Sequence, residues 1–157
     1  FGDDDMTAED ASGDEYEISD VPLYERFYAG GHRSFRGFEY RGVGPRGIRA
    51  DTGELGDDPV GGDWLLLTGL EYQFPLLGRP NPGEHTGLLN GVVFTDMGTV
   101  QDDVGLDEWR VSVGAGLRLK IPFLGQAPFA LDFAIPLLRQ DGDEEQFFSF
   151  DLALPLR

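Results

Sequence analysis

Positively charged side chains gather in one early stretch of an otherwise acidic chain. Residues 24–47 (YERFYAGGHRSFRGFEYRGVGPRG) contain five arginines: Arg26, Arg33, Arg36, Arg41 and Arg46. The 157-residue chain as a whole has a formal net charge of -17. A guanidinium in such a chain can form two parallel hydrogen bonds to one carboxylate. Because the stretch is too polar for a buried strand and too rich in glycine for a helix, we predict a long loop.

Other patterns that could do chemistry are weak. The segment GVGPRG (residues 42–47) matches the glycine spacing of a dinucleotide site, but no strand precedes it, and its proline removes a phosphate-binding amide. His32 and His85 lack the spacing of metal ligands. Glu71 and Asp96 could be read as a carboxylate pair for glycoside hydrolysis, but the resemblance described below implies an arginine beside them and therefore an ion pair. We therefore expect no enzyme, no catalytic residue, no metal and no cofactor.

Composition narrows the class of partner. The strong negative charge argues against nucleic acid, because phosphate binding needs clustered Lys and Arg. Cysteine is absent, which excludes a disulfide framework. No run of about 18 apolar residues is present, as a transmembrane helix would require. Residues 1–20 carry nine acids and no base, so we predict an acidic, flexible segment there.

From Asp63 onward the sequence alternates with a period of two, which indicates β-strands. We predict five strands, at residues 64–74, 88–100, 109–121, 128–137 and 148–154, separated by turns at 75–87 and 122–127 and acidic loops at 101–108 and 138–145. The alternation places Glu71 and Asp96 on the polar face of their strands. The acids Asp143 to Glu145 are predicted to be solvated.

Two architectures fit these strands. In a soluble antiparallel sheet the apolar face is the core, whereas in a membrane barrel it meets lipid and the polar face lines the lumen. Strands of about ten residues match the membrane span of a tilted strand. Acidic loops on one side and shorter or nearly neutral turns on the other are typical of outer-membrane barrels. The pattern favours the barrel but leaves the soluble sheet open.

The motifs then resemble one family. Residues 20–47 resemble the sixth extracellular loop of the BamA family of bacterial outer-membrane protein assembly factors, within the superfamily of bacterial surface antigens and POTRA-barrel transporters. The family's Val-Arg-Gly-Phe tetrad reads Phe35, Arg36, Gly37 and Phe38 here. The resemblance continues through GGDWLLLTGLEYQFP, VVFTDMGTV and RVSVGAGLRLKIPFLG to the last strand.

The resemblance implies a fold and a set of site residues. The fold would be an all-β antiparallel transmembrane barrel, of which the chain supplies the long extracellular loop (residues 21–62) and the last five strands (63–157) of a longer protein. The loop would fold back into the barrel, where Arg36 would contact Glu71 and Asp96 on the inner wall. The last strand resembles the family's C-terminal seam strand, with Phe148, Phe150, Leu152 and Leu154 on one face. Its end departs from the usual pattern, because Leu156 and Arg157 replace the terminal aromatic residue.

The implied function is that of part of an insertase in the bacterial outer membrane. It would fold client outer-membrane proteins and insert them into the lipid bilayer, together with assembly-machinery lipoproteins and without nucleic acid. A related polypeptide-secretion or translocation pore is the alternative within the superfamily. A soluble acidic β-sheet binding module is the alternative from another class.

Overall fold

The computed structural model describes residues 6–9, 15–18, 21–48, 52, 55–78, 87–120 and 128–152. Its main element is a five-stranded antiparallel sheet in the order β11-β9-β8-β7-β6. These strands are β6 (Trp64–Leu77), β7 (Leu89–Gln101), β8 (Arg110–Lys120), β9 (Pro128–Leu138) and β11 (Phe148–Leu152). The arrangement confirms the predicted all-β antiparallel fold. Within the described ranges, no helix is long and apolar enough to cross a membrane.

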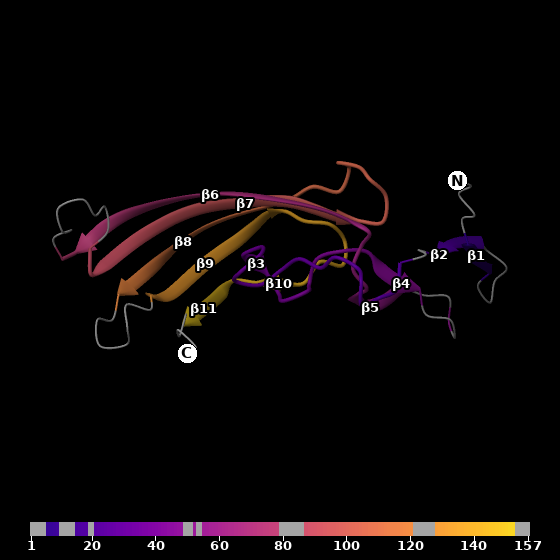
Figure 1. The fold of residues 1–157 in the computed structure, drawn as a ribbon, viewed down its shortest axis with the longest axis horizontal. Helices are drawn as coiled ribbons and strands as arrows, with labels where there is room; N and C mark the ends of the chain where they lie inside the picture. Colours follow the sequence, from indigo (N-terminus) through magenta and orange to yellow (C-terminus); the bar gives the residue numbers. More distant parts are fainter. Residues whose placement is uncertain are drawn as a thin grey trace.

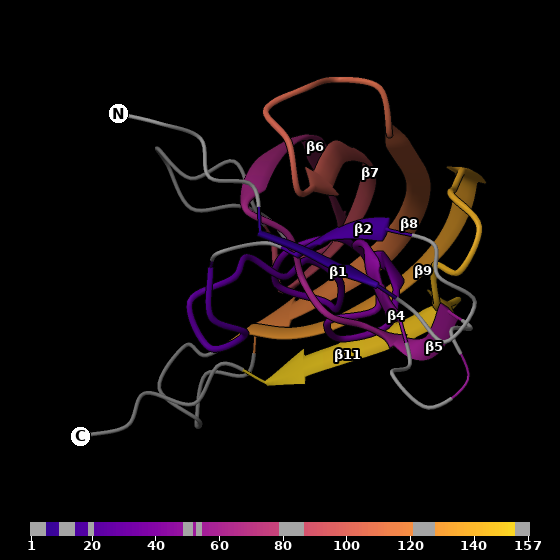
Figure 2. The ribbon, with the colours of Figure 1, turned by 90° about the vertical axis from the view of Figure 1, so that its right-hand side faces the viewer.

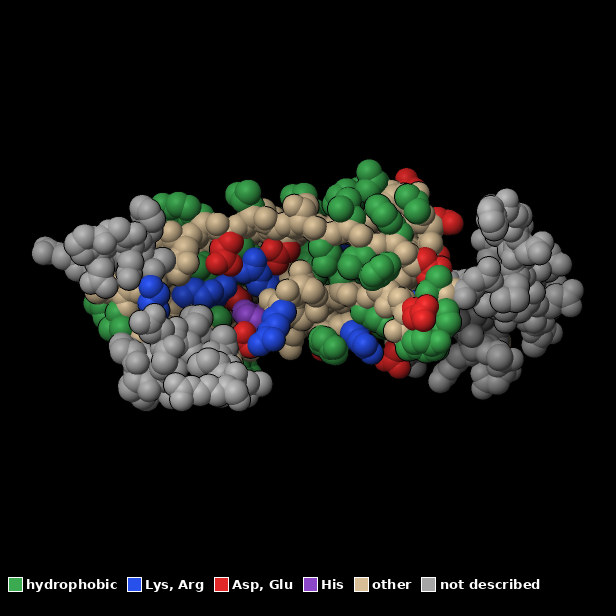
Figure 3. Space-filling model, in the orientation of Figure 1, with side chains coloured by type: hydrophobic (Ala, Val, Ile, Leu, Met, Phe, Trp, Pro, Cys, Tyr) green, Lys and Arg blue, Asp and Glu red, His purple; other side chains and the backbone are tan. Residues whose placement is uncertain are grey.

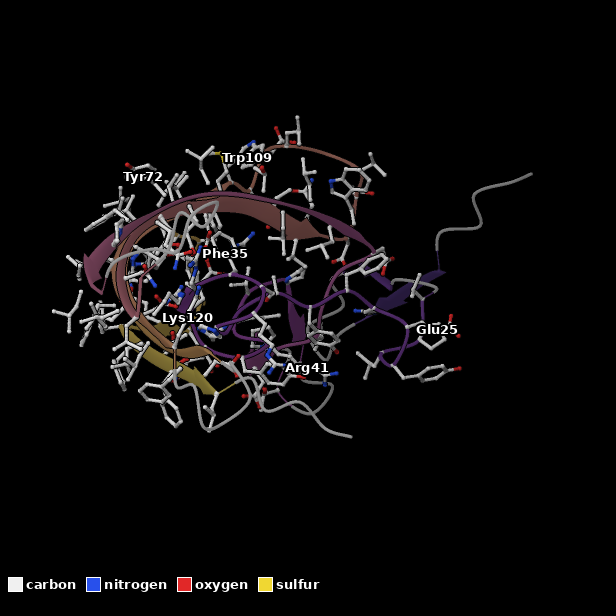
Figure 4. All side chains as sticks on the ribbon, turned by 60° about the vertical axis from the view of Figure 1, so that its left-hand side comes forward. Glu25, Phe35, Arg41, Tyr72, Trp109 and Lys120 are labelled. Atoms are coloured by element: carbon white, nitrogen blue, oxygen red, sulfur yellow. The ribbon has the colours of Figure 1, made fainter. Side chains whose placement is uncertain are left out.

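The sheet curves strongly, so that it has a convex and a concave face (Figure 1; Figure 2). Apolar side chains of the convex face are exposed, including Leu70, Tyr72, Phe133, Ile135 and Phe150. Figure 4 shows Tyr72 pointing away from the sheet, while Phe35 lies within its curve. Burying apolar side chains against lipid stabilises a membrane sheet, so this exposure is expected of strands that face a bilayer.

The predicted end of the first strand was wrong by three residues, and several other strand ends differ by one. The turn was predicted to begin at Pro75, but β6 continues to Leu77, with a register shift between Pro75 and Leu77 against β7. Proline lacks a backbone donor and is tolerated at sheet edges and bulges. Among the described strands β6 is an edge, so the missing donor at Pro75 breaks no second ladder.

The predicted long loop contains short strands and lies against the concave face (Figure 2). β3 (Gly37–Phe38) pairs with β10 (Glu145–Gln146), and β4 (Arg46–Ile48) pairs with β5 (Leu55–Pro59). Its small apolar core consists of Ala29, Phe35, Phe38 and Val43 packed on Val100 of β7. This core holds the loop inside the curve of the sheet.

The acidic N-terminal segment also differs from its prediction. β1 (Met6–Glu9) pairs with β2 (Glu15–Ile18) as an antiparallel hairpin, where no secondary structure was predicted. Two adjacent antiparallel strands can exchange backbone hydrogen bonds whatever the polarity of their side chains. A low apolar content therefore did not exclude the pairing.

Candidate functional site

The backbone around Arg36 is folded into a tight turn that faces the sheet. The amide of Gly31 donates to the carbonyl of Phe38 at 2.8 Å. The Ser34 hydroxyl donates to the Gly30 carbonyl at 2.7 Å. Gly37 has φ 95°, and a Cβ at this position would lie only 3.1 Å from the Cβ of Ser112 on β8. Glycine at position 37 therefore allows both the backbone conformation and the close approach to the wall.

Arg36 forms a forked contact with Asp96 and a further contact with Glu71. Its Nε and Nη2 atoms donate to the two carboxylate oxygens of Asp96, each at 2.8 Å. Its Nη1 atom donates to Oε2 of Glu71 at 2.5 Å. The structure thus brings together the loop arginine and the two strand acids that the sequence singled out. Paired hydrogen bonds to a carboxylate fix the plane of the guanidinium as well as its position.

Phe94 of β7 supports the guanidinium from below. The Arg36 Cζ atom lies 3.4 Å from the centre of the Phe94 ring, which is a cation–π contact. The ring in turn lies over Gly114 of β8, where a Cβ would come within 2.2 Å of Phe94 Cζ. The Ser112 hydroxyl donates to the Arg36 carbonyl at 2.5 Å. The site is therefore a stack of arginine, aromatic ring and glycine.

Sequence reasoning missed these three supporting residues. Phe94 is two residues from Asp96 and so lies on the same face of its strand, which is the signal that could have found it. Gly114 and Ser112 are small residues on the polar face of the most regular strand. Which of them meets the loop depends on register, which alternation does not encode.

The electrostatics favour a fully charged Arg36. Burial alone lowers the pKa of the Arg36 guanidinium, but the hydrogen bonds and charges of Asp96 and Glu71 outweigh it and raise the pKa above its ordinary value. Only 12% of the Arg36 side chain and 10% of the Asp96 side chain is exposed. A charge removed from water to this extent requires a partner, and removal of that partner is costly.

The ionic contacts continue beyond Arg36 along the concave face. Glu71 Oε2 also accepts from Arg118 Nη2 at 3.3 Å. Arg118 then donates to both oxygens of the fully buried Asp132, at 2.6 and 3.0 Å. Gly116 leaves room for this carboxylate, because a Cβ there would lie 2.0 Å from Asp132 Oδ1. Figure 3 shows acidic and basic side chains gathered beneath the sheet.

The remaining predicted residues lie elsewhere. Phe35 and Phe38 are fully buried in the loop core, with their ring centres 4.8 Å apart. The predicted seam residues Phe148, Phe150 and Leu152 are on the outer face of β11, where Phe148 contacts Phe133 with 5.1 Å between ring centres. They do not meet the Arg36 site. Leu154 lies outside the described residues.

A second arginine pair was not predicted. Asp143, predicted to be solvated, is 1% exposed and accepts from Nε of the 2% exposed Arg110 at 2.9 and 3.0 Å. Arg110 Nη1 also donates to the Glu108 carbonyl at 3.0 Å. The prediction was wrong because the loop after β9 folds onto the loop before β8, which a local charge pattern cannot reveal.

Comparison with known proteins identifies relatives of this chain. Residues 7–154 match the family model described as the Omp85 superfamily domain. The chain is 34% identical over 137 residues to the outer membrane protein assembly factor BamA of Nitratidesulfovibrio vulgaris, covering 85% of this chain and 16% of that protein. It is 28% identical over 157 residues to BamA of Neisseria meningitidis serogroup B, covering 85% of this chain and 19% of that protein. The chain therefore spans less than one fifth of the length of these relatives.

The solved structures include a similar protein. The crystal structure of BamA from Haemophilus ducreyi lacking POTRA domains 1–3 matches with a TM-score of 0.68 and 28% identity, over 83% of this chain and 27% of that chain.

Proposed function

The chain belongs to the Omp85 superfamily, and from that membership we propose that it forms part of an insertase for β-barrel proteins. Membership confirms the resemblance, the barrel-type fold and the bacterial outer-membrane location that were predicted from the sequence. The proposed partners are unfolded client outer-membrane proteins and the lipid bilayer. Accessory assembly lipoproteins are proposed on the family resemblance.

The observation that carries the proposal is the attachment of the loop to the inner wall. Arg36 reaches β7 and β6 through Asp96 and Glu71, and its carbonyl reaches β8 through Ser112. One loop thus ties together three strands of the sheet from the inside. A wall fixed in this way keeps its curvature while a neighbouring strand changes partners.

The strand proposed to change partners is β11. It pairs with β9 alone among the described strands, so one of its edges has no described neighbour. Free backbone donors and acceptors at an edge can template an incoming strand by β-augmentation. The convex apolar face would meet the bilayer into which the client passes. This mechanism uses binding and geometry, and we propose that it needs no catalytic group, metal or cofactor.

The experiment compares Arg36→Ala with Arg41→Ala in the intact membrane protein. Each variant is reconstituted into liposomes, and the rate at which an unfolded client barrel becomes inserted is measured by protease protection. We expect Arg36→Ala to slow insertion at least tenfold, which corresponds to raising the activation free energy of insertion by roughly 1.4 kcal/mol or more. Arg41 stacks on Tyr28 and Tyr40 in the same loop, and its removal should leave the rate unchanged.

Two outcomes would contradict the proposal. One is a normal insertion rate for Arg36→Ala. The other is that the unaltered protein fails to accelerate insertion yet passes an unfolded polypeptide across the liposome membrane, as a secretion pore would.

A further inference from the structure

The last described strand, β11, pairs with β9 alone among the described strands. Its described part, Phe148–Leu152, pairs with residues 129–133 of β9. Side-chain contacts of these residues add to the backbone pairing in fixing the position of the strand.

Two loop residues, His32 and Arg33, supply such contacts on the concave face. Arg33 Nη2 donates to Asp151 Oδ1 of β11 at 3.1 Å. The His32 ring lies between two carboxylates, with its Nδ1 3.2 Å from Asp132 Oδ2 of β9 and its Nε2 3.7 Å from Asp151 Oδ2. These are close charge contacts without the geometry of a hydrogen bond at Nδ1. The two loop residues therefore join the terminal strand and its neighbour to the loop.

The connection crosses a hollow. A cavity of about 440 Å³ lies between the loop and β11, with a wall formed by residues 30–34 and Tyr40 on one side and residues 148–151 on the other. Because the cavity separates the loop from β11 here, polar side chains rather than packed apolar groups make the link. Such a link can break and form again without unpacking the apolar core of the loop.

The same contacts connect β11 to the Arg36 site. Acids and bases alternate along the concave face in the order Asp96, Arg36, Glu71, Arg118, Asp132, His32, Asp151 and Arg33. Each consecutive pair is in contact. Three of these eight residues belong to the loop, and the other five come from all five strands of the sheet.

We propose that His32 and Arg33 are positioning residues that hold β11 to the loop, so that docking of the loop through Arg36 also fixes the last strand. Movement of the loop away from the wall would then release β11 for exchange with a client strand. The hold itself follows from the geometry, and only its use in strand exchange rests on the proposed function.

Hydrogen–deuterium exchange of the backbone amides of residues 148–152 in the intact protein tests the hold directly. Asp151→Asn weakens the contacts with both loop residues, and we expect exchange there to become roughly two- to fivefold faster, as for loss of a partly exposed ion pair. Asp141→Asn makes the same chemical change in an exposed loop acid and should leave these amides unchanged. Equal exchange in the Asp151 and Asp141 variants would overturn the proposal.

Swapping the charges of Arg33 and Asp151 distinguishes a positioning role from general damage to the fold. Arg33→Asp places like charges together and should accelerate exchange in β11 beyond the effect of Asp151→Asn. Combining it with Asp151→Arg restores an opposite pair and should return exchange toward the unaltered rate. If Arg33→Asp does not fold, Arg33→Ala removes the same contact and is compared with Asp151→Asn. The Arg33 side chain is 77% exposed, so its removal leaves no cavity. Failure of the reversed pair to restore protection would contradict a specific contact.

The coupling is tested with Arg36→Ala, which alters no residue in contact with β11. We expect faster exchange in residues 148–152 as well as in the loop, and unchanged exchange in that variant would disprove the coupling. Client insertion by the Asp151→Asn variant is then measured. If the amides of β11 exchange faster but client insertion is unaltered, the claim that His32 and Arg33 position β11 still stands. The claim that release of β11 serves client insertion is then contradicted.

Discussion

Two arginines in this protein bind carboxylates in similar geometry but in different surroundings. The side chains of Arg110, the first residue of β8, and Asp143, in the loop after β9, are 2% and 1% exposed and join that loop to the end of the sheet. Arg36 and Asp96 are 12% and 10% exposed and belong to a series of contacts that crosses the sheet. The first pair is closed off from solvent. The second borders a cavity of about 610 Å³, and Glu71, the other partner of Arg36, also binds Arg118. The Arg110 pair therefore holds one loop to the sheet, whereas Arg36 connects the long loop to several strands at once.

The largest effect on stability is expected from Arg110→Ala. The substitution leaves Asp143 buried with its main partner removed, which costs about 3–5 kcal/mol in comparable pairs. Urea unfolding of the intact protein in micelles measures it, with Arg36→Ala as the comparison. If Arg36→Ala proves more destabilising than Arg110→Ala, the assignment of a stabilising and a positioning arginine is wrong.

The second largest effect on stability is expected from Gly114→Val, because Gly114 lies against the Phe94 ring that supports Arg36. The added side chain would occupy the place of the Phe94 ring and displace the surface on which Arg36 rests. Overpacking of this kind costs about 1–3 kcal/mol. Ala115→Val is the control, since Ala115 is exposed on the opposite face. Equal midpoints of unfolding for the two variants would show that the stack does not support the arginine.

A smaller effect is expected from Arg36→Lys. Lysine keeps the charge but cannot make the forked contact with both oxygens of Asp96. We expect a loss of about 1 kcal/mol in stability, together with a reduced rate of client insertion. Arg110→Lys, measured alongside, should lose more stability, because fewer water molecules can replace the missing bonds there. The reverse order would break the comparison.

The smallest effect concerns Asp102, in the loop after β7 beside the Arg110 region. Partial burial, with the nearby charges of Asp63, Asp103 and Glu108, raises the pKa of the Asp102 carboxyl, although Arg26 opposes the shift. A raised folded-state pKa means that the stability linked to this group is greatest at acidic pH. It is lost as pH rises through the folded-state pKa.

Asp102→Asn should therefore slightly stabilise the protein at neutral pH and leave stability at low pH unchanged. Unfolding midpoints at neutral and acidic pH, compared with those of Asp141→Asn, measure the difference. Greater stabilisation of the Asp102 variant at acidic than at neutral pH would contradict the stated direction.

The sequence was most informative where a contact follows from local periodicity. Alternation in β6 and β7 placed Glu71 and Asp96 on one face, and the family motif supplied Arg36 as the side chain opposite them. By contrast, the contacts of Asp132 with His32 and of Asp143 with Arg110 join segments far apart in the chain. They depend on the path of a loop and on strand register, and no spacing in the sequence expresses either.

The burial of Phe35 and Phe38 shows a further limit. They were predicted as parts of a loop motif, and the structure makes them the centre of a small apolar core. A loop rich in glycine and arginine gives no apolar period from which such a core could be predicted. The two rings became recognisable as core only with the sheet in place behind them.

The pairing of β3 with β10 also constrains how the protein acquires its structure. This short ladder brings the loop near the start of the chain against a segment just before the last strand. Arg33 and Asp151, which meet beside it, are 118 residues apart in the sequence. Contacts of such long range are slow to form, because the intervening chain must first be brought together. The pairing of β3 with β10 and the contact of Arg33 with Asp151 can therefore form only after the C-terminal segment has arrived, which places this part of loop docking late in the protein's own biogenesis.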